Sequence, residues 1–424
     1  MEPKDIERGM QSPMKAAPRS HRPAAMLVTY SFPPVNTAGV HRPVALLRNL
    51  AKNGWRVTVL TAEPDNRKPC DPSLVEDFQG AVKVIRSPSP DLPGIAARLI
   101  KRRPKPGGPS RRAAARQPSQ PGRPGKPATM RKRLIDWASW WLHVPDSVAG
   151  WFFPALRSGL HEMRQEHPDV LFATGPPWTS LILAATLSWL RRVPLVADFR
   201  DPWHGSPWHH LPYAAHRVFR GWLESRVVRR AGRITCATAG IERLLRDRYP
   251  AKATAIGTVL NGFDLSKVNA VPAVRLDNDR CMLIHAGSFY IHRSPAPLFQ
   301  GLRTLCDAHP EAREQLTVVL IGSDRYQGRP LSQWADTHGV GDLVRSLGHR
   351  PHTEALGMLK GADVALLFGQ GGSKALPPVP RKTYEYIGAG KPVLAIGAGD
   401  EACEVLRQGG IGRASCRERV CHRV

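Results

Sequence analysis

Apolar positions along this chain fall into two recurring patterns: short continuous runs and longer stretches with helical spacing. Residues 25–30 form the first apolar run, which predicts a buried strand. Residues 40–53 carry apolar side chains at helical spacing, and Gly54 follows them as a helix stop. Residues 55–61 predict the next strand. This order of strand, helix and strand is typical of a Rossmann-like parallel sheet.

The same alternation continues along the chain in two series. In the first series we expect further strands at residues 82–86, 170–174, 194–198 and 233–237. A turn at residues 261–264 and a linker at residues 267–279 then separate the two series. In the second series we expect strands at residues 282–287, 316–322, 344–348, 364–368 and 392–397. The predicted fold class is therefore α/β, with two Rossmann-like domains facing across a cleft.

An amphipathic helix is expected just before the last of these strands. It begins near Arg381, carries the acidic residue Glu385, and ends at the glycines of residues 388–390. In such units ligands bind at the carboxyl ends of strands and the amino ends of helices. Glu385 is therefore our candidate for binding the ribose hydroxyls of a nucleotide.

Composition and charge add an unusual segment to this picture. The 424 residues are 42% hydrophobic, enough for two domains with real cores. The net charge is +26, and half of it comes from the 13 basic residues between Asp91 and Asp136, where no acidic residue occurs. We interpret residues 92–133 as a disordered insertion rich in proline and glycine. An anchor to anionic lipid is the alternative, and nucleic acid is disfavoured because no aromatic residues interleave with the charges.

The termini and the cysteines bear on location. Residues 1–23 have no apolar core, so we expect a disordered tail and no signal peptide. No apolar run reaches the roughly 18 residues of a membrane span. The seven cysteines form no CxxC pair, which predicts reduced thiols. We expect a cytoplasmic protein, with peripheral attachment to the inner face of the cell membrane left open.

The last residues differ from the rest of the chain. Residues 411–424 show neither helical nor strand periodicity, and I-G-R-A-S-C-R-E-R-V-C resembles the translation of a common sequencing adapter. On that interpretation the genuine protein continues past about residue 410, and the second domain is incomplete. An ordinary basic tail is the alternative. The predicted domains are residues 24–265 and 266–410.

Polar loops directly follow several predicted strands of the first domain. Gly39 precedes a helix, where backbone amides suit a phosphate or the close approach of an acceptor, although a plain tight turn fits equally well. The loop lacks the GxGxxG spacing of dinucleotide-binding dehydrogenases. Gly175 and the group Asp198, Arg200 and Asp201 follow two other strands and share one sheet edge. We expect that group to orient an acceptor hydroxyl or to lie beside the reacting sugar; a salt-bridged loop is the alternative.

Three motifs occur here in the order found in one known family. They are Y-S-F-P-P-V-N-T-A-G-V-H-R from residue 30, D-F-R-D-P-W from residue 198 and K-T-Y-E-Y-I-G-A-G-K-P-V from residue 382. Over residues 24–410 the chain resembles the retaining GT-B glycosyltransferases of family 4. The resemblance implies transfer of a sugar from a nucleotide-sugar donor to a lipid-linked or polysaccharide acceptor, with retention, in the synthesis of cell-surface glycans.

The resemblance also implies which residues hold the donor. Arg293 and Lys382 would bind the diphosphate leaving group, because a positioned cation stabilises the charge that grows on its oxygens. Gly39 and Gly287 would allow the diphosphate to approach the backbone. The expected mechanism is front-face attack, in which the leaving diphosphate helps to deprotonate the acceptor. For Arg293, a place on the surface without such a role is the alternative.

Further positions follow the family pattern or depart from it. Relatives contact the nucleobase through the backbone at the positions of Gly348, His349 and Arg350. Ser288 stands where the family usually has an arginine, so more of the phosphate binding is expected from Arg293 and Lys382. Pro377 stands where many relatives have a second glutamate near the transferred sugar.

The first-domain motif departs from the family as well. Arg200 occupies a position where many relatives have a histidine, which puts a histidine-based role in doubt. Arg200 and Asp201 are nevertheless counted with Arg293 and Lys382 as catalytic candidates. The departures leave two other functions open: a non-catalytic scaffold that binds nucleotide-sugar, and a GT-B-like sugar-nucleotide epimerase.

No metal or other cofactor is expected. Asp277-Asn278-Asp279 imitates the DxD metal site of another glycosyltransferase fold, but it precedes a strand and predicts a linker turn. Four neighbouring histidines lack a convincing ligand spacing, namely His204, His209, His210 and His216.

A group of aromatic residues carries two interpretations. Most of them, at helical spacing, suggest core packing; the alternative is contact with a membrane interface, together with a basic helix near residues 217–230. The residues are Trp137, Trp140, Trp141, Trp151, Phe152, Phe153, Trp203, Trp208 and Trp222.

Overall fold

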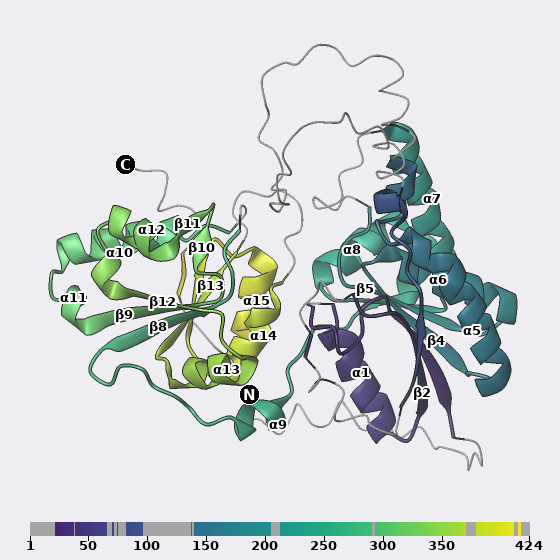
Figure 1. Ribbon diagram of the computed structural model, residues 1–424, viewed down its shortest axis with the longest axis horizontal. Helices are drawn as coiled ribbons and strands as arrows, with labels where there is room; N and C mark the ends of the chain where they lie inside the picture. The colour runs from purple at the N-terminus through teal and green to yellow at the C-terminus, as the bar shows by residue number, and fades with distance from the viewer. Residues whose placement is uncertain are drawn as a thin grey trace, which may run out of the picture. The chain divides into compact units, whose positions relative to one another are not determined.

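The computed structural model describes residues 22–37, 39–65, 70–71, 74, 82–95, 137, 140–204, 213–290, 293–369, 379–410 and 414–416, the last three by backbone alone. This part of the chain forms two large parallel sheets with helices packed on them (Figure 1). Several expectations fall outside the described residues: the tail at 1–21, the insertion from residue 96 to 133, Trp208, His209, His210 and Pro377.

In the described chain the first sheet has strand order β3-β2-β1-β4-β5-β6-β7. Its strands are β1 (Ala24–Val28), β2 (Arg56–Ala62), β3 (Val82–Ser87), β4 (Val170–Gly175), β5 (Leu195–Phe199), β6 (Arg233–Cys236) and β7 (Ile256–Thr258). Its helices are α1 (His41–Lys52), α5 (Phe152–Glu166), α6 (Trp178–Arg191), α7 (Ala214–Arg230) and α8 (Ala239–Arg248). The first strand–helix–strand unit predicted from the sequence is confirmed.

The second sheet repeats the arrangement in the order β12-β9-β8-β13-β14-β15. Its strands are β8 (Cys281–Ala286), β9 (Leu316–Ile321), β12 (Val344–Gly348), β13 (Val364–Phe368), β14 (Val393–Ile396) and β15 (Ala414–Cys416), all paired in parallel. The helices are α9 (Leu265–Ala270), α10 (Ala296–Ala308), α11 (Ala312–Gln315), α12 (Leu331–Thr337), α13 (His352–Gly361), α14 (Arg381–Gly388) and α15 (Asp400–Gln408). A small hairpin, β10 (Arg325–Tyr326) and β11 (Arg329–Pro330), precedes α12.

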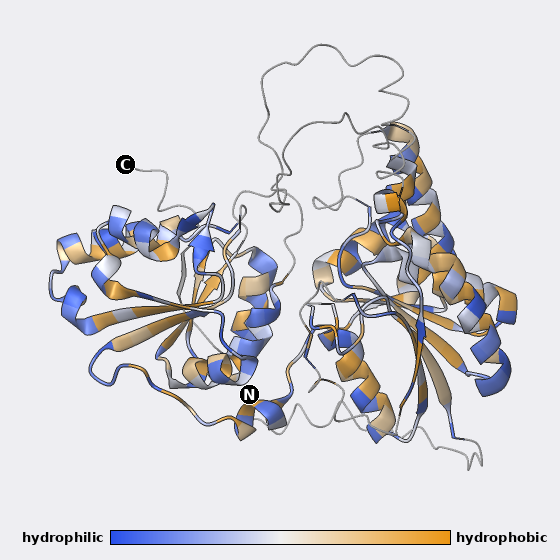
Figure 2. Ribbon diagram, viewed as in Figure 1, coloured by the Kyte–Doolittle hydropathy of each residue, from blue (hydrophilic) through white to orange (hydrophobic). Residues whose placement is uncertain are grey.

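Burial explains why the central strands have continuous apolar runs. Every residue of β1 is buried, because helices cover both faces of a parallel sheet and leave no polar side (Figure 2). In the second sheet, α10 and α12 pack on one face, and α13, α14 and α15 on the other. The strands predicted from apolar runs are therefore confirmed, to within about two residues at their ends.

The predicted linker needs a correction. The sequence predicts a turn at residues 261–264 and a linker at 267–279, but α9 begins at Leu265, capped by the carboxylate of Asp264. Val268 of α9 is buried in the core of the second sheet. The segment was misassigned because α9 is a single short amphipathic turn, too brief for a periodic signal.

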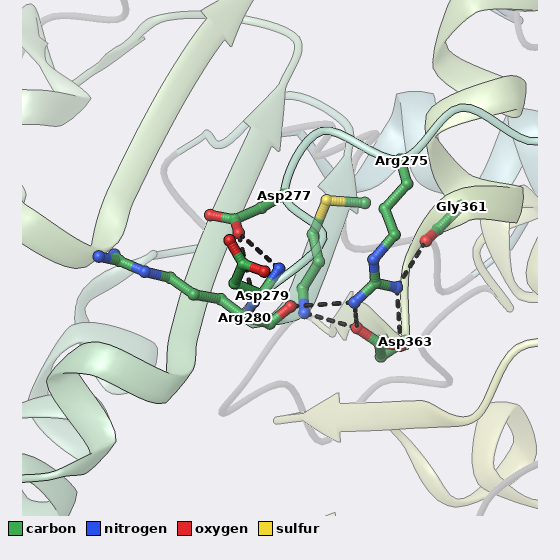
Figure 3. Close-up of polar contacts among 7 residues, drawn as sticks. Arg275, Asp277, Asp279, Arg280, Gly361 and Asp363 are labelled. Carbon is green, nitrogen blue, oxygen red and sulfur yellow. Dashed lines mark hydrogen bonds and ion pairs between the residues drawn. The ribbon is translucent and has the colours of Figure 1, made fainter.

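An arginine fixes the end of this segment. Arg275 donates to both carboxylate oxygens of Asp363, at 3.0 and 2.9 Å, and to the carbonyl oxygens of Gly361 and Arg280 (Figure 3). Asp363 also accepts from the amide of Met282. The segment before β8 is thus held against the loop before β13 by a bidentate ion pair.

Apart from the small hairpin of β10 and β11, two short strands of the large sheets were not predicted. β7 lies at the edge of the first sheet and has only three residues. β15 lies inside the segment for which the sequence predicts no regular structure, and its backbone pairs with β14 from Leu394 to Ile396. Strands of three residues are too short to show alternation, which explains both omissions.

Candidate functional site

Three glycines lie together at the carboxyl edge of the second sheet. Gly287 follows β8 and donates to Ile321 at 2.6 Å; Gly322 follows β9 and donates to the carbonyl of Gly348 at 2.9 Å. A Cβ on Gly322 would lie 2.3 Å from the carbonyl oxygen of Gly287, closer than any side chain tolerates. The three strand ends therefore form a backbone floor whose glycines carry no side chains of their own, which suits the close approach of a ligand.

Lys382 extends over this floor from the first turn of α14. A Cβ on Gly287 would lie 2.6 Å from Cε of the lysine, so the glycine is what lets the lysine cross the strand end. Burial lowers the pKa of the Lys382 ammonium, and the charges of Arg381 and Arg293 lower it further, against an opposing effect of Glu385. An anion bound beside this ammonium would stabilise its charged form. Lys382 and Gly287, which the family resemblance assigns to the donor site, therefore lie next to each other.

Arg293 approaches the same place from the loop after β8. Its backbone and that of Tyr290 exchange two hydrogen bonds, at 2.6 and 3.3 Å, which hold the two residues side by side. The guanidinium lies over the Tyr290 ring, 5.0 Å from its centre. Its Nε is buried and has no hydrogen-bond partner among the described residues. Its charge lowers the pKa of Lys382, so the two cations lie near each other.

Glu385 lies one turn further along α14 and is held by two basic side chains. Arg381 forms an ion pair with it at 2.7 Å, and Nε2 of His352 lies 3.5 Å from the same oxygen. Burial alone would raise the pKa of Glu385, but the hydrogen bond from His352 and the charges of Arg381 and Lys382 outweigh it and hold the pKa at about 2. Glu385 is therefore a carboxylate acceptor, as binding of ribose hydroxyls requires.

His285, the residue before the last of β8, was not identified from the sequence. A Cβ on Gly287 would lie 2.8 Å from its Nε2, so the ring borders the same small space as Lys382. The only sequence signal was a polar residue inside an otherwise apolar strand.

The nucleobase candidates lie at the end of β12. Gly348 has a φ of +67°, and the pairing of β12 with β9 shifts register between Ser346 and Gly348. His349 and Arg350 follow it and are exposed. The structure therefore places Gly348 with the other two strand-end glycines through its carbonyl. Among the described residues, His349 and Arg350 make no hydrogen bond or ion pair with Lys382 or Glu385.

Two candidates of the first sheet lie where the sequence predicts. Gly39 lies just before α1, and Gly175 is the last residue of β4. A Cβ on Gly175 would lie 3.0 Å from the ring of Trp178 and 3.1 Å from Leu181. Asp146 accepts from the amide and hydroxyl of Thr179, at 2.9 and 2.8 Å, and so holds the start of α6 after this glycine.

The Asp198 group divides by burial. Asp198 has no exposed surface, and the hydroxyl of Thr235 on β6 donates to it at 2.7 Å. Arg200 and Asp201 lie in the loop after β5 and are half-buried. Asp198 thus links two strands of the sheet, and the two loop residues are the ones with surface to offer an acceptor.

Asp277 and His216, which belong to the two metal-like patterns, make ordinary contacts. The Asp277 carboxylate accepts from the amides of Asp279 and Arg280, at 3.3 and 3.2 Å, which makes it a turn-forming residue (Figure 3). Arg345 lies 3.6 Å from its other oxygen. His216 is enclosed by the rings of Trp137, Trp141 and Tyr213. Within the described ranges, no three His, Cys, Asp or Glu side chains gather as metal ligands would.

Helix α7 presents an apolar and basic face to solvent. Phe219 and Trp222 stack with ring centres 5.5 Å apart, and Arg226 lies over the Trp222 ring at 5.1 Å. Val218 beside them is 73% exposed and Trp222 47%. The described helices include none with the length and apolar composition to cross a bilayer.

Known proteins resemble this chain in sequence. Residues 39–262 match the family described as the glycosyl transferase 4-like domain. A curated relative, the D-inositol 3-phosphate glycosyltransferase of Thermomonospora curvata, is 28% identical over 192 residues, which make up 42% of this chain and 43% of that protein. The match therefore spans less than half of the relative's length.

Solved structures resemble the chain in fold. A glycosyltransferase from Rickettsia africae gives a TM-score of 0.55 at 10% identity. The match covers 93% of this chain and 85% of the Rickettsia chain. HepE of Anabaena, solved in complex with UDP, gives a TM-score of 0.51 at 16% identity. The match covers 94% of this chain and 87% of the HepE chain. Both likenesses extend over the two sheets.

Proposed function

The chain belongs to the glycosyl transferase 4-like family, and we propose that its second sheet binds the nucleoside diphosphate part of a sugar donor. The protein is a glycosyltransferase with the two Rossmann-like domains of the GT-B fold. HepE of the same fold binds UDP, which supports a nucleotide-sugar as the donor class here.

The observation that carries this proposal is a pair of neighbouring cations, Lys382 over the glycine floor and Arg293 close to it. Lys382 crosses Gly287, and the buried Nε of Arg293 lies unpaired among the described residues. Burial makes a cation costly unless an anion lies nearby, so two neighbouring cations favour a ligand of high negative charge density, such as a diphosphate. Glu385, held ionised in the next turn of α14, then accepts from the ribose hydroxyls.

The same arrangement suits sugar transfer with retention. As the bond between the anomeric carbon and the phosphate oxygen breaks, charge grows on the diphosphate, and Arg293 and Lys382 stabilise it. The acceptor hydroxyl forms a bond to the anomeric carbon on the face that the diphosphate leaves. Its proton passes to the departing phosphate oxygen, so the step needs no further base.

The first sheet is proposed to hold the acceptor. Gly39, Gly175, Arg200 and Asp201 follow strands or precede a helix at the carboxyl edge of that sheet, where open α/β sheets bind ligands. The exposed aromatic and basic face of α7 supports an acceptor presented at an anionic membrane, such as a lipid-linked glycan. A role in cell-surface glycan synthesis follows from that acceptor class.

The test measures donor binding and turnover by the full chain. We expect Arg293→Ala and Lys382→Ala each to weaken UDP binding by about tenfold to a hundredfold, because each removes a charge-assisted hydrogen bond to phosphate. Arg313→Ala is the control, since this arginine of α11 directly precedes β9 and so lies at the amino edge of the sheet, opposite the strand-end glycines. Isothermal titration with UDP, and with GDP in case the base is guanine, gives the affinities.

Hydrolysis of the donor in the absence of an acceptor tests the chemistry. Proton NMR of glucose newly released from UDP-glucose reports its anomeric form, and retention predicts the α-anomer. Release of the β-anomer would contradict the proposed mechanism. Tight binding without any turnover indicates a scaffold, and a changed sugar still attached to the nucleotide indicates an epimerase; either result would overturn the proposed transfer reaction.

A further inference from the structure

The imidazole of His285 is a polar ring in an apolar enclosure. It is 1% exposed, and the rings of Phe289 and Phe368 lie 5.0 and 4.8 Å away between centres. A buried polar group without a hydrogen bond costs about 1–3 kcal/mol, so each ring nitrogen calls for a partner.

One nitrogen has its partner in the neighbouring strand. Nδ1 lies 2.8 Å from the carbonyl oxygen of Leu366, because the register of β8 and β13 places these residues side by side. A carbonyl only accepts, so Nδ1 carries the proton and Nε2 carries the lone pair. The hydroxyl of Tyr386 donates to the same carbonyl at 3.3 Å and closes the other side. The ring is thus fixed in one tautomer and one orientation.

The second nitrogen faces the cations of the donor site. Nε2 is buried and has no hydrogen-bond partner in the described part of the chain. The position that a Cβ of Gly287 would occupy lies 2.8 Å from Nε2 and 2.6 Å from Cε of Lys382. Burial, together with the charges of Lys382 and Arg293, lowers the pKa of His285 to about 3, so the ring stays uncharged beside them.

We propose that Nε2 of His285 accepts a hydrogen bond from the ammonium of Lys382 when a diphosphate is bound, which makes His285 a positioning residue of the donor site. An uncharged acceptor orients the ammonium without neutralising it, whereas a carboxylate there would compete with the phosphate for the charge. One N–H of the ammonium then points to His285, and the other two remain for phosphate oxygens. This inference rests on the proposed diphosphate site.

The experiment compares ligands that differ by one phosphate, using the full chain. His285→Phe keeps an aromatic ring between Phe289 and Phe368 but removes the acceptor. We expect it to weaken UDP binding about tenfold while UMP binding changes little, since Lys382 is assigned to the diphosphate. His285→Gln offers an amide oxygen in place of Nε2 and is expected to restore most of the UDP affinity. His338→Phe, a ring substitution at a second histidine packed against aromatic rings, is the control.

A double-mutant cycle shows whether His285 acts through Lys382. With Lys382→Ala already present, His285→Phe is expected to have almost no further effect on UDP affinity. Additive losses would overturn the inference, as would equal losses for UDP and UMP. If the wild-type chain binds neither UDP nor GDP, the proposed diphosphate site itself is contradicted. That result differs from a failure of the His285 inference, in which the wild-type chain still binds UDP.

A measurement on the wild-type protein covers the case in which His285→Phe does not fold. In ¹⁵N NMR of histidine-labelled protein, Nε2 of His285 is expected to show the shift of an unprotonated nitrogen and to move toward the hydrogen-bonded value when UDP is added. A resonance that does not respond to saturating UDP would contradict the proposed contact.

Discussion

Glu385 shows how a single largely buried carboxyl stays charged. Its ion pair with Arg381 and its hydrogen bond with His352 come from two different helices, α14 and α13. These groups outweigh the effect of burial, which alone would raise its pKa. The carboxylate is therefore available as an acceptor, and it also contributes to stability.

That contribution depends on pH with a defined sign. Because the pKa of Glu385 falls from 4.5 to about 2 on folding, the stabilisation is complete above pH 4.5 and is lost as the pH falls toward 2. We expect the difference in free energy of unfolding between wild type and Glu385→Gln to shrink by about 3 kcal/mol over this range. Urea titrations at pH 7, 4.5 and 2.5 measure it.

The matched control for this prediction is Glu354→Gln, which removes an exposed carboxylate of α13. It separates the effect of one buried group from a general loss of negative charge. A difference between wild type and Glu385→Gln that stays constant from pH 7 to pH 2.5 would show that the carboxylate is not held in this way.

Residue types alone did not distinguish Glu385 from Asp198. Both are acidic residues, Asp198 near the end of a strand and Glu385 within a helix, and both were predicted to bind substrate. Asp198 lies inside its sheet and accepts from Thr235, whereas Glu385 keeps 19% of its side-chain surface. Burial within a sheet depends on the neighbouring strand and on the side chain opposite, so it appears only in the folded chain.

At the scale of elements, backbone hydrogen bonds join the ends of β8, β9 and β12, and a glycine stands at each end. Gly348 has a φ of +67° with open space around its Cβ position, whereas Gly322 has a φ of +134° and a backbone carbonyl 2.3 Å from that position. We expect Gly348→Ala to cost about 1 kcal/mol from backbone strain and Gly322→Ala on the order of 3 kcal/mol or more. Chemical denaturation of both variants measures the contrast.

Gly287 differs from Gly322 in the atoms that an added Cβ would meet. A Cβ there meets the flexible end of Lys382 and the imidazole of His285 rather than a backbone atom. We expect Gly287→Ala to destabilise the fold less than Gly322→Ala does, and to weaken UDP binding more than Gly348→Ala does. Equal stability losses for all three variants would contradict the geometry of the glycine floor.

The order of elements was predictable because buried parallel strands have unambiguous apolar runs. The alternation predicted both sheets and the helix bearing Lys382 and Glu385. It missed α9, β7 and β15, which are too short for a periodic signal. It also missed His285, because its role depends on Leu366 and Lys382, which lie some 80 and 100 residues away in the chain.

At the scale of the whole molecule, positive charge and exposed aromatic residues favour binding to an anionic membrane surface. The net charge is +26, and α7 adds Arg226 and the stacked pair Phe219 and Trp222 to the solvent-facing surface. Basic residues near an anionic membrane each contribute about 1 kcal/mol, and the aromatic rings insert at the interface. The two effects differ in salt dependence, since only the first is screened.

Vesicle sedimentation tests this expectation. We expect the full chain to bind vesicles that contain phosphatidylglycerol, to bind pure phosphatidylcholine vesicles weakly, and to lose binding as salt increases. Trp222→Ser should weaken binding to the anionic vesicles by about fivefold to a hundredfold, as about 1–3 kcal/mol of apolar burial is lost. Trp189→Ser, at a tryptophan of α6 that is 68% exposed, is the matched control. Equal effects of the two substitutions would remove α7 as the contact surface.

The carbonyl of Leu366 receives hydrogen bonds from both His285 and Tyr386. Because this acceptor belongs to the main chain, every amino acid at position 366 supplies it. The tautomer of His285 is thus insensitive to point mutation at its own partner. Substitutions at residue 366 that the core tolerates should therefore leave the direction of the Nε2 lone pair unchanged, as long as β13 stays beside β8.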